Sequence, residues 1–134
     1  MTTRKWKLDT DYKYLVEWWK QYDFGTVPKE CLPPDGVVVL LDRPICAAGL
    51  YLCKGTKFGF MEWVVVDKKI GLKTAHNALN LCIEEIIQMA KDNNIKLLYT
   101  VTAQEALQKR YTKYHDMEIG EKSSMTFVKD LSNK

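Results

Sequence analysis

No apolar run in the sequence approaches the roughly 20 residues that a transmembrane helix needs, and the N-terminal segment MTTRKWKLDTDYK lacks the apolar core of a signal peptide. Internal repeats, low-complexity segments and linkers are also missing. The formal net charge is only +3 with both signs spread along the chain, which does not favour nucleic-acid binding. We therefore expect one cytoplasmic domain, residues 1–134, that does not bind a membrane, and a nucleic-acid-associated protein is a weaker alternative that rests only on the mild positive charge.

Metal ligands are scarce as well. The chain has four cysteines, none of them in a CxxC pair, and only two histidines. Cys46 and Cys53 lie in a strand-like apolar run, and Cys82 lies on an apolar helix face. We expect buried free thiols in a reducing cytosol and no metal centre, with a metal site or a catalytic cysteine as the alternative.

The first quarter of the chain predicts a strand over residues 4–8 and then a helix capped by Asp9 or Thr10. Adjacent tryptophans in this helix, Trp18 and Trp19, are not expected to face the core together. One would then line a groove or a dimer contact, unless the two pack as a buried pair against the sheet edge. An apolar stripe at helical spacing supports the helix: Tyr12, Leu15, Trp19 and Tyr22.

The middle of the chain predicts three strands joined by short turns, over residues 37–42, 45–52 and 58–67, which should be antiparallel neighbours. From Thr74 the apolar period becomes helical and stays so to Ala90. A buried strand follows over residues 95–102, and the long helix before it makes a parallel crossover to the strand at 58–67.

The last third predicts one more helix and two strands. Thr102 and Glu105 form a T-x-x-E capping box for a helix that runs to Tyr114. The segments MEIG and SMTFVKDL read as two strands around a turn. The predicted fold class is therefore α/β, with a single mixed, mostly antiparallel sheet that carries helices on both faces.

One stretch, MEWVVVDKKIGLKTAHNAL (residues 61–79), passes directly from a strand into a helix. Such a join leaves backbone N–H groups free at the start of the helix, where they can bind a phosphate. Phosphate-binding turns are usually rich in glycine, and this one has a single glycine, Gly71. A solvated cluster of lysines at a plain connection is the alternative interpretation.

The element order resembles that of the GNAT acyltransferases. The strand WVVVD, the helix from Thr74, the strand LLYTVT and Tyr111 in LQKRYTKY carry the resemblance. The turn departs from the family pattern R/Q-x-x-G-x-G/A, because Lys73 replaces a signature glycine while Ala75 is acceptable for the other. A register that starts at Lys68 fits no better. Such glycine-poor variants resemble the divergent GNAT-like proteins often carried by phages.

The resemblance implies a site for acetyl-CoA, the cosubstrate. Its pantetheine arm would pair with the backbone of Val64, Val65 and Val66. Its pyrophosphate would rest on the N–H groups at the start of the helix, where the helix dipole favours negative charge. The Lys73 side chain could bind phosphate directly, although its Cβ narrows the approach of the backbone. The residues of this turn are Gly71, Lys73, Thr74, Ala75 and His76.

The resemblance also implies acetyl transfer to the amine of an unidentified acceptor. Glu62, in an otherwise apolar strand, is the candidate base, unless it points to solvent or pairs with a lysine. His76 is a second candidate base. Tyr111 is the candidate acid that protonates the departing thiolate, with Tyr114 as the fallback and a core tyrosine as the alternative. The acceptor groove would lie between the first helix, the loop at 24–34 and the last strands.

Two departures from the family pattern leave catalysis open. The turn lacks its glycine, and the Gly-Phe that often follows the helix is replaced by His115, Asp116 and Met117. A GNAT-like domain that has lost catalysis and serves as a binding or structural module is therefore the alternative function.

Overall fold

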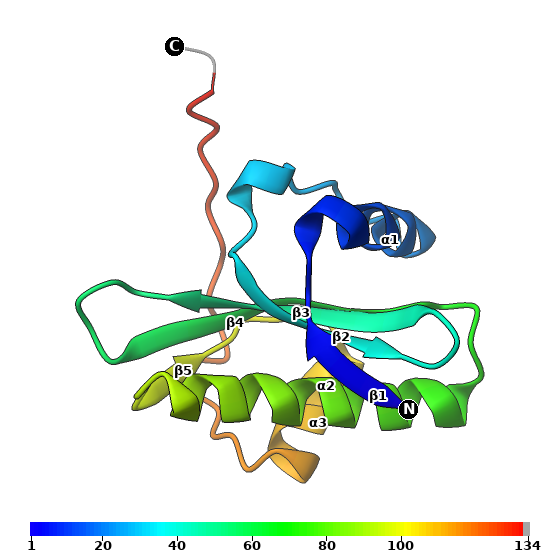
Figure 1. Ribbon diagram of the computed structural model, residues 1–134. Helices are drawn as coiled ribbons and strands as arrows, with labels where there is room; N and C mark the ends of the chain where they lie inside the picture. Colours follow the sequence, from blue (N-terminus) through cyan, green and yellow to red (C-terminus); the bar gives the residue numbers. More distant parts are fainter. Residues whose placement is uncertain (133–134) are drawn as a thin grey trace.

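The computed structural model describes residues 1–132 and has a single five-stranded sheet in the order β1-β2-β3-β4-β5 (Figure 1). The helix α1 lies on one face of the sheet, and α2 and α3 lie on the other (Figure 1). The predicted fold class is confirmed. The strands are β1 (Thr2–Lys5), β2 (Asp35–Leu40), β3 (Pro44–Leu52), β4 (Phe58–Val66) and β5 (Leu97–Tyr99). The helices are α1 (Leu8–Gln21), the 3-10 turn η1 (Lys29–Cys31), α2 (Leu72–Asp92) and α3 (Glu105–Tyr114).

The sheet is antiparallel from β1 to β4 and parallel between β4 and β5, as the crossover through α2 predicts. The β4–β5 ladder is short, because it runs only from Phe58↔Leu97 to Phe60↔Tyr99. β5 is thus much shorter than the strand predicted over residues 95–102. β4 continues for six residues beyond its last pair with β5, still paired with β3 on its other edge, and the edge left without a partner on the β5 side faces the candidate site.

Two apolar layers hold the helices to the sheet. The layer between the sheet and α2 contains Val39, Leu50, Met61, Ile83 and Ile86, all fully buried. The layer under α1 contains Trp18 and Trp19, with exposed fractions of 1% and 2%. The expectation that the two tryptophans cannot both face the core is therefore wrong, and the buried-pair alternative holds.

The pair fits because α1 presents a wide apolar stripe to the sheet. Trp19 packs edge-on against Trp63 of β4, with ring centroids 6.5 Å apart, whereas Trp18 packs against Tyr14 at 6.0 Å. Consecutive residues point about 100° apart on a helix, so two large rings can reach the core on either side of the line of contact.

Both predicted side-chain caps are wrong. α1 begins after Lys7, and the side chain of Asp11 accepts the Lys7 N–H at 2.8 Å instead of a cap from Asp9 or Thr10. α3 begins at Glu105, and the Thr102 hydroxyl accepts the Gln104 N–H at 3.1 Å in a local turn. Short polar side chains compete for nearby backbone groups in several ways, so their presence does not fix the first residue of a helix.

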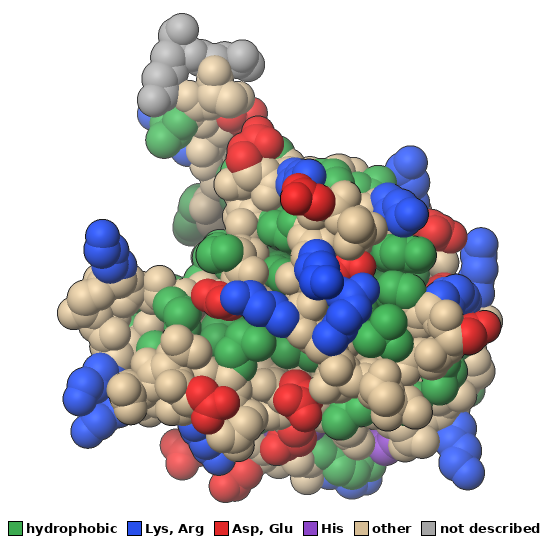
Figure 2. All heavy atoms as spheres, in the orientation of Figure 1, with side chains coloured by type: hydrophobic (Ala, Val, Ile, Leu, Met, Phe, Trp, Pro, Cys, Tyr) green, Lys and Arg blue, Asp and Glu red, His purple; other side chains and the backbone are tan. Residues whose placement is uncertain are grey.

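The two strands predicted in residues 117–120 and 124–131 are also wrong. Neither stretch forms a strand in the structure, and the end of this segment extends away from the body (Figures 1 and 2). Met117 packs partly buried against the core, whereas the later apolar side chains are exposed, with Met125 at 82%, Phe127 at 89% and Val128 at 93%. An alternating pattern describes a surface that can pack in a sheet, but pairing also needs a partner strand, and β5 offers an edge of only three residues.

Charge on the face seen in Figure 2 is mixed, with lysines and arginines interspersed among acidic side chains. None of the helices in the described part of the chain is both long and apolar enough to cross a membrane.

Candidate functional site

A β-bulge in β4 shapes the site. Ala47 of β3 pairs with Val65, but Gly49 pairs with Glu62, so β4 has one extra residue in this interval. Trp63 takes up the extra length with a left-handed backbone conformation, φ 62°. As a result Met61 and Val64, three residues apart, both face α2, which strict strand alternation forbids. The sequence contains no signal for this bulge, because a tryptophan rather than a glycine occupies it.

Beyond the last β4–β5 pair the two segments diverge, and two adjoining pockets open. The larger pocket, about 770 Å³, lies between β4, the chain after β5, α3 and the loop after α1. The smaller pocket, about 260 Å³, continues along β4 to the start of α2. Both pockets are lined by Phe24, Val64, Gln104 and Leu107, so they form one continuous groove.

Glu62 lines the larger pocket. Burial raises the pKa of this carboxyl, and the Val101 backbone N–H across the gap opposes that rise by favouring the charged form. Within the described residues Glu62 forms no ion pair, so the alternative of a lysine partner is not supported. Glu62 therefore presents a carboxylate, easier to protonate than usual, to the groove.

Tyr111 lines the same pocket from α3 and is 6% exposed. Burial and the charge of Glu62 raise the pKa of this phenol to about 12, although a hydrogen bond with Thr100 acts against the shift. Its hydroxyl consequently keeps its proton at any ordinary pH. Tyr114, the fallback candidate, is 47% exposed and lines neither pocket.

The smaller pocket is lined by several of the residues predicted to bind the cosubstrate. Val64, Val65 and Val66 line it from β4, and Ala75 and His76 line it from the first turns of α2. The Tyr22 hydroxyl donates to the Val66 carbonyl at 2.9 Å, which shows that this carbonyl points away from β3. Backbone orientation alternates along a strand, so the polar groups of Val64 face the groove as well.

The helix α2 begins without a side-chain cap. Its N-cap is Gly71, with φ −63° and ψ 155°, and its first turn contains no acidic residue. The first intrahelical bond joins the Ala75 N–H to the Gly71 carbonyl, so the N–H groups of Leu72, Lys73 and Thr74 have no intrahelical partner. No residue of this turn has a positive φ, so the turn does not require glycine and Lys73 sits there without backbone strain. Gly71, Lys73 and Thr74 lie at the end of the smaller pocket but do not line it.

No known protein-family model and no curated protein matches the sequence. Solved structures do match. The Arabidopsis thaliana glucosamine-6-phosphate N-acetyltransferase is 14% identical, with a TM-score of 0.64 over 95% of this chain and 98% of that chain. The aminoglycoside acetyltransferase meta-AAC0020 from an uncultured soil metagenomic sample, in complex with sisomicin, is 11% identical, with a TM-score of 0.66 over 98% and 96%. Rv2747 from Mycobacterium tuberculosis, in complex with CoA and NLQ, is 15% identical, with a TM-score of 0.65 over 84% and 70%.

These likenesses decide the architecture. The chain has the GNAT acetyltransferase fold. At 11% to 15% identity the likeness concerns the fold alone, so the groove has to be interpreted from this chain's own residues.

A polar network on the α2–α3 side of this GNAT domain was not anticipated. Arg110 lines the smaller pocket and donates from Nη1 to Asn80 Oδ1 at 2.7 Å, with His76 Nδ1 at 3.3 Å. His115 contacts Glu84 at 2.6 Å and Asn80 at 3.2 Å. The Arg110 Nε atom is buried and has no hydrogen-bond partner. His76 thus belongs to the smaller pocket, away from Glu62, and sequence spacing could not reveal a network whose members are some 30 residues apart.

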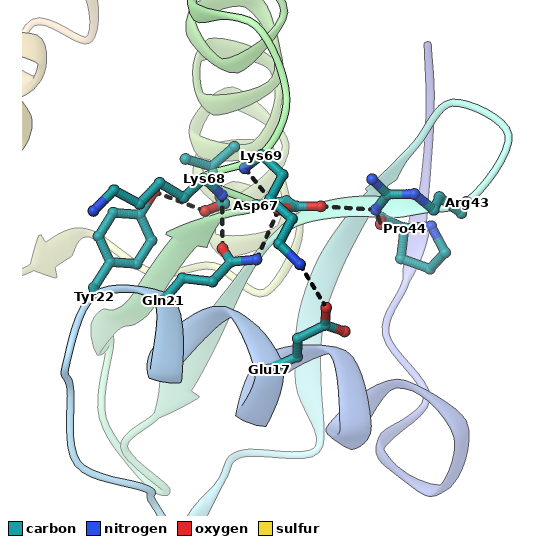
Figure 3. A network of polar contacts seen from close by, with 9 residues as sticks. Glu17, Gln21, Tyr22, Arg43, Pro44, Asp67, Lys68 and Lys69 are labelled. Atoms are coloured by element: carbon teal, nitrogen blue, oxygen red, sulfur yellow. Dashed lines mark hydrogen bonds and ion pairs between the residues drawn. The ribbon is translucent and has the colours of Figure 1, made fainter.

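A second network fixes the turn between β4 and α2 (Figure 3). Buried Asp67 accepts hydrogen bonds from Gln21 at 2.9 Å, from Arg43 at 2.8 Å and from the Lys69 N–H at 2.9 Å. Gln21 in turn accepts the Lys68 N–H at 2.7 Å. The network ties the end of α1 to the turn that places the uncapped start of α2 beside the groove.

Within residues 1–132 no three His, Cys, Asp or Glu side chains come together as a metal site.

Proposed function

We propose that this chain is an acetyl-CoA-dependent N-acetyltransferase. One observation carries the proposal: Glu62 and Tyr111 line one pocket, which opens into a second pocket formed by the open edge of β4 and the uncapped start of α2. A carboxyl and a phenol thus lie at one end of a groove, and a site suited to an anion lies at the other.

The residues present fit acetyl-CoA. The backbone of Val64 and Val66 offers hydrogen-bond partners to the pantetheine arm. The free N–H groups of Leu72, Lys73 and Thr74 suit the pyrophosphate, because no acidic side chain competes for them. The unpaired Arg110 Nε is a further buried donor beside the smaller pocket.

Acetyl-CoA would supply the acetyl group, and side chains of this chain would accept protons and donate hydrogen bonds. As an ammonium becomes an amide, the C–N bond forms, the C–S bond breaks and the nitrogen loses two protons. Glu62 accepts one of these two protons. In the overall balance the second proton ends on the departing thiolate, which leaves as a thiol. The pKa of Tyr111, about 12, lies some 3.5 units above that of an ordinary thiol, so its role is to donate a hydrogen bond to the leaving sulfur.

Titration with acetyl-CoA, followed by calorimetry or by a thermal shift, tests the proposal. At about 100 times its dissociation constant the ligand should add roughly 2.7 kcal/mol of stability. Arg110→Met should weaken this binding, whereas Lys113→Met, an equal change of charge on an exposed side chain of α3, should not. Absence of any shift at millimolar acetyl-CoA would overturn the proposal.

A binding module without catalysis is the second candidate. The departures from the family pattern favour it: Lys73 stands in the turn in place of a glycine, and His115, Asp116 and Met117 replace the Gly-Phe after α3. Acetyl-CoA binding without acetyl transfer to any amine, and without release of free thiol, would support this candidate.

A further inference from the structure

The larger pocket carries a single charge. Of the side chains that line it within residues 1–132, Glu62 is the carboxylate, and no lysine or arginine is among them. Most of the remaining wall is apolar or aromatic, formed by Trp19, Phe24, Val27, Trp63, Val101 and Val128, and the uncharged polar residues Thr26, Thr100, Thr102 and Gln104 complete it. At about 770 Å³ the pocket has the size of a small-molecule site.

The aromatic wall also lacks free hydrogen-bond donors. Trp63 Nε1 donates to the Tyr51 hydroxyl at 2.9 Å, and that hydroxyl donates to the Cys31 carbonyl at 2.7 Å. The indole N–H is therefore occupied, and the ring is held in one orientation by this bond and by the edge contact with Trp19. What remains available to a ligand is the apolar surface of the ring.

These features exclude some classes of acceptor by their chemistry. A phosphate or carboxylate on the acceptor would face the Glu62 carboxylate with no cation in the pocket lining. The free-energy cost of removing water from that anion would then not be offset by an ion pair. A sugar with many hydroxyls would have only the few uncharged polar residues of the pocket, Thr26, Thr100, Thr102 and Gln104, as partners, and its other hydroxyls would be unpaired against the apolar walls. A cationic amine on an apolar body satisfies both features, because the ammonium pairs with Glu62 and the body covers the aromatic surface.

Resting on the proposed function, we infer that the acceptor is a small primary amine with an apolar, preferably aromatic, body and no anionic group. The amine binds as its ammonium form at Glu62, and the body lies against Trp63, Val101 and Val128. Selectivity then follows from the walls of the larger pocket, whereas the cosubstrate is held in the smaller one.

Phenethylamine, tryptamine and glucosamine 6-phosphate are the probes. Binding of each to the full chain is measured by calorimetry without acetyl-CoA, and product formation is measured by mass spectrometry with it. We expect both arylalkylamines to bind and to be acetylated with kcat/KM at least about tenfold above that for glucosamine 6-phosphate, a difference that one compensated charge can supply.

Two variants on the exposed C-terminal segment form a matched pair. Val128→Lys places a cation at the pocket wall, whereas Met125→Lys places one on the same segment away from the pocket. Val128→Lys should raise KM for phenethylamine by about tenfold through like-charge repulsion, and Met125→Lys should leave it unchanged. Equal effects of the two variants would contradict the assignment of this wall.

The outcomes separate this inference from the proposed function. Acetyl-CoA binding together with a preference for glucosamine 6-phosphate would overturn the acceptor class while the transferase stands. Arylalkylamine binding without acetyl-CoA binding would support the amine pocket and overturn the transferase. Failure of the arylalkylamines to bind would overturn the inference, whichever way acetyl-CoA behaves, and so would their failure to react when acetyl-CoA does bind.

Discussion

At the scale of single residues, the groove contains two ionisable side chains whose pKa values are both shifted upward by their surroundings. Burial raises the pKa of Glu62 and also that of Tyr111. The carboxylate becomes a better proton acceptor, whereas the phenol becomes a weaker acid that never ionises in the working range. In the proposed transfer, these opposite consequences favour Glu62 as the base and Tyr111 as a hydrogen-bond donor.

Glu62→Gln should remove the acidic limb of the rate profile. A base acts only when deprotonated, so activity of the unmodified chain should rise with pH through the pKa of Glu62, which lies above the usual value of about 4.3. The variant should be slower by roughly a hundredfold and should lack this limb. Profiles of kcat/KM from acid to neutral pH measure it, with exposed Glu118→Gln as the control. A limb that persists in Glu62→Gln would exclude Glu62 as the base.

Tyr111→Phe should slow turnover and leave acetyl-CoA binding intact. The lost hydrogen bond to a charged sulfur corresponds to roughly 1.5–3 kcal/mol, or about tenfold to a hundredfold in rate. The pKa of about 12 predicts that no alkaline limb from this residue appears below about pH 11. Tyr114→Phe, one helical turn further along α3, is the matched control. If the two variants turn over equally fast, Tyr111 is only a core tyrosine.

At the scale of elements, the turn from β4 into α2 is fixed by Asp67. Burial acts to raise the pKa of Asp67, but the hydrogen bonds from Lys69 N–H, Gln21 and Arg43 outweigh it and hold the pKa below its ordinary value. Because the folded-state pKa is depressed, this contribution to stability is present above the unfolded pKa of about 3.9 and is lost as pH falls through the folded value.

Asp67→Ala should therefore lower the free energy of unfolding by about 1–3 kcal/mol at neutral pH, since three donors lose a buried acceptor. The difference from the unmodified chain should shrink in the acid range. Urea unfolding at several pH values measures it, and exposed Asp42→Ala is the control. A loss of stability that does not change with pH would mean that the ionised carboxylate is not the source of the effect.

Gly71→Asp should change stability and binding in opposite directions. An aspartate at this N-cap would bond the free N–H groups of α2 and complement its dipole, which stabilises the chain by about 1 kcal/mol. The same carboxylate would occupy and repel the proposed pyrophosphate site, so acetyl-CoA affinity should fall at least about tenfold. Gly71→Ala leaves the N–H groups free and meets no atom within 4 Å, so it should retain binding. Equal affinity in both variants would separate the helix start from the cosubstrate.

The elements also show what periodicity could and could not predict. The helix α2, the antiparallel strands β2 to β4 and the parallel crossover were predicted because each has an apolar face that repeats over many residues. The bulge at Trp63 was not predicted, because a single inserted residue does not change the apolar period of the strand in a recognisable way. Glu62 and Tyr111 were proposed from a family resemblance, whereas Arg110 and Asp67 emerge only from contacts between elements far apart in sequence.

At the scale of the whole molecule, the main difference between expectation and structure is the C-terminal segment. The two stretches predicted as strands, residues 117–120 and 124–131, do not form strands. Phe127 and Val128 remain almost fully exposed, and Val128 alone of this segment lines the larger pocket. The segment is therefore a contributor to the acceptor wall and not to the core.

Removal of residues 121–134 should consequently leave the fold intact. The exposed side chains of residues 121–132 bury little surface, so the free energy of unfolding should change by no more than about 0.5 kcal/mol. Acetyl-CoA affinity should be unchanged, because the smaller pocket has no lining residue from this segment. KM for an arylalkylamine should rise, because the pocket loses the wall at Val128. Urea unfolding and calorimetry on the shortened chain measure all three. A loss of several kcal/mol would instead mean that this segment pairs with the edge of β5 in solution, as its alternating pattern predicts.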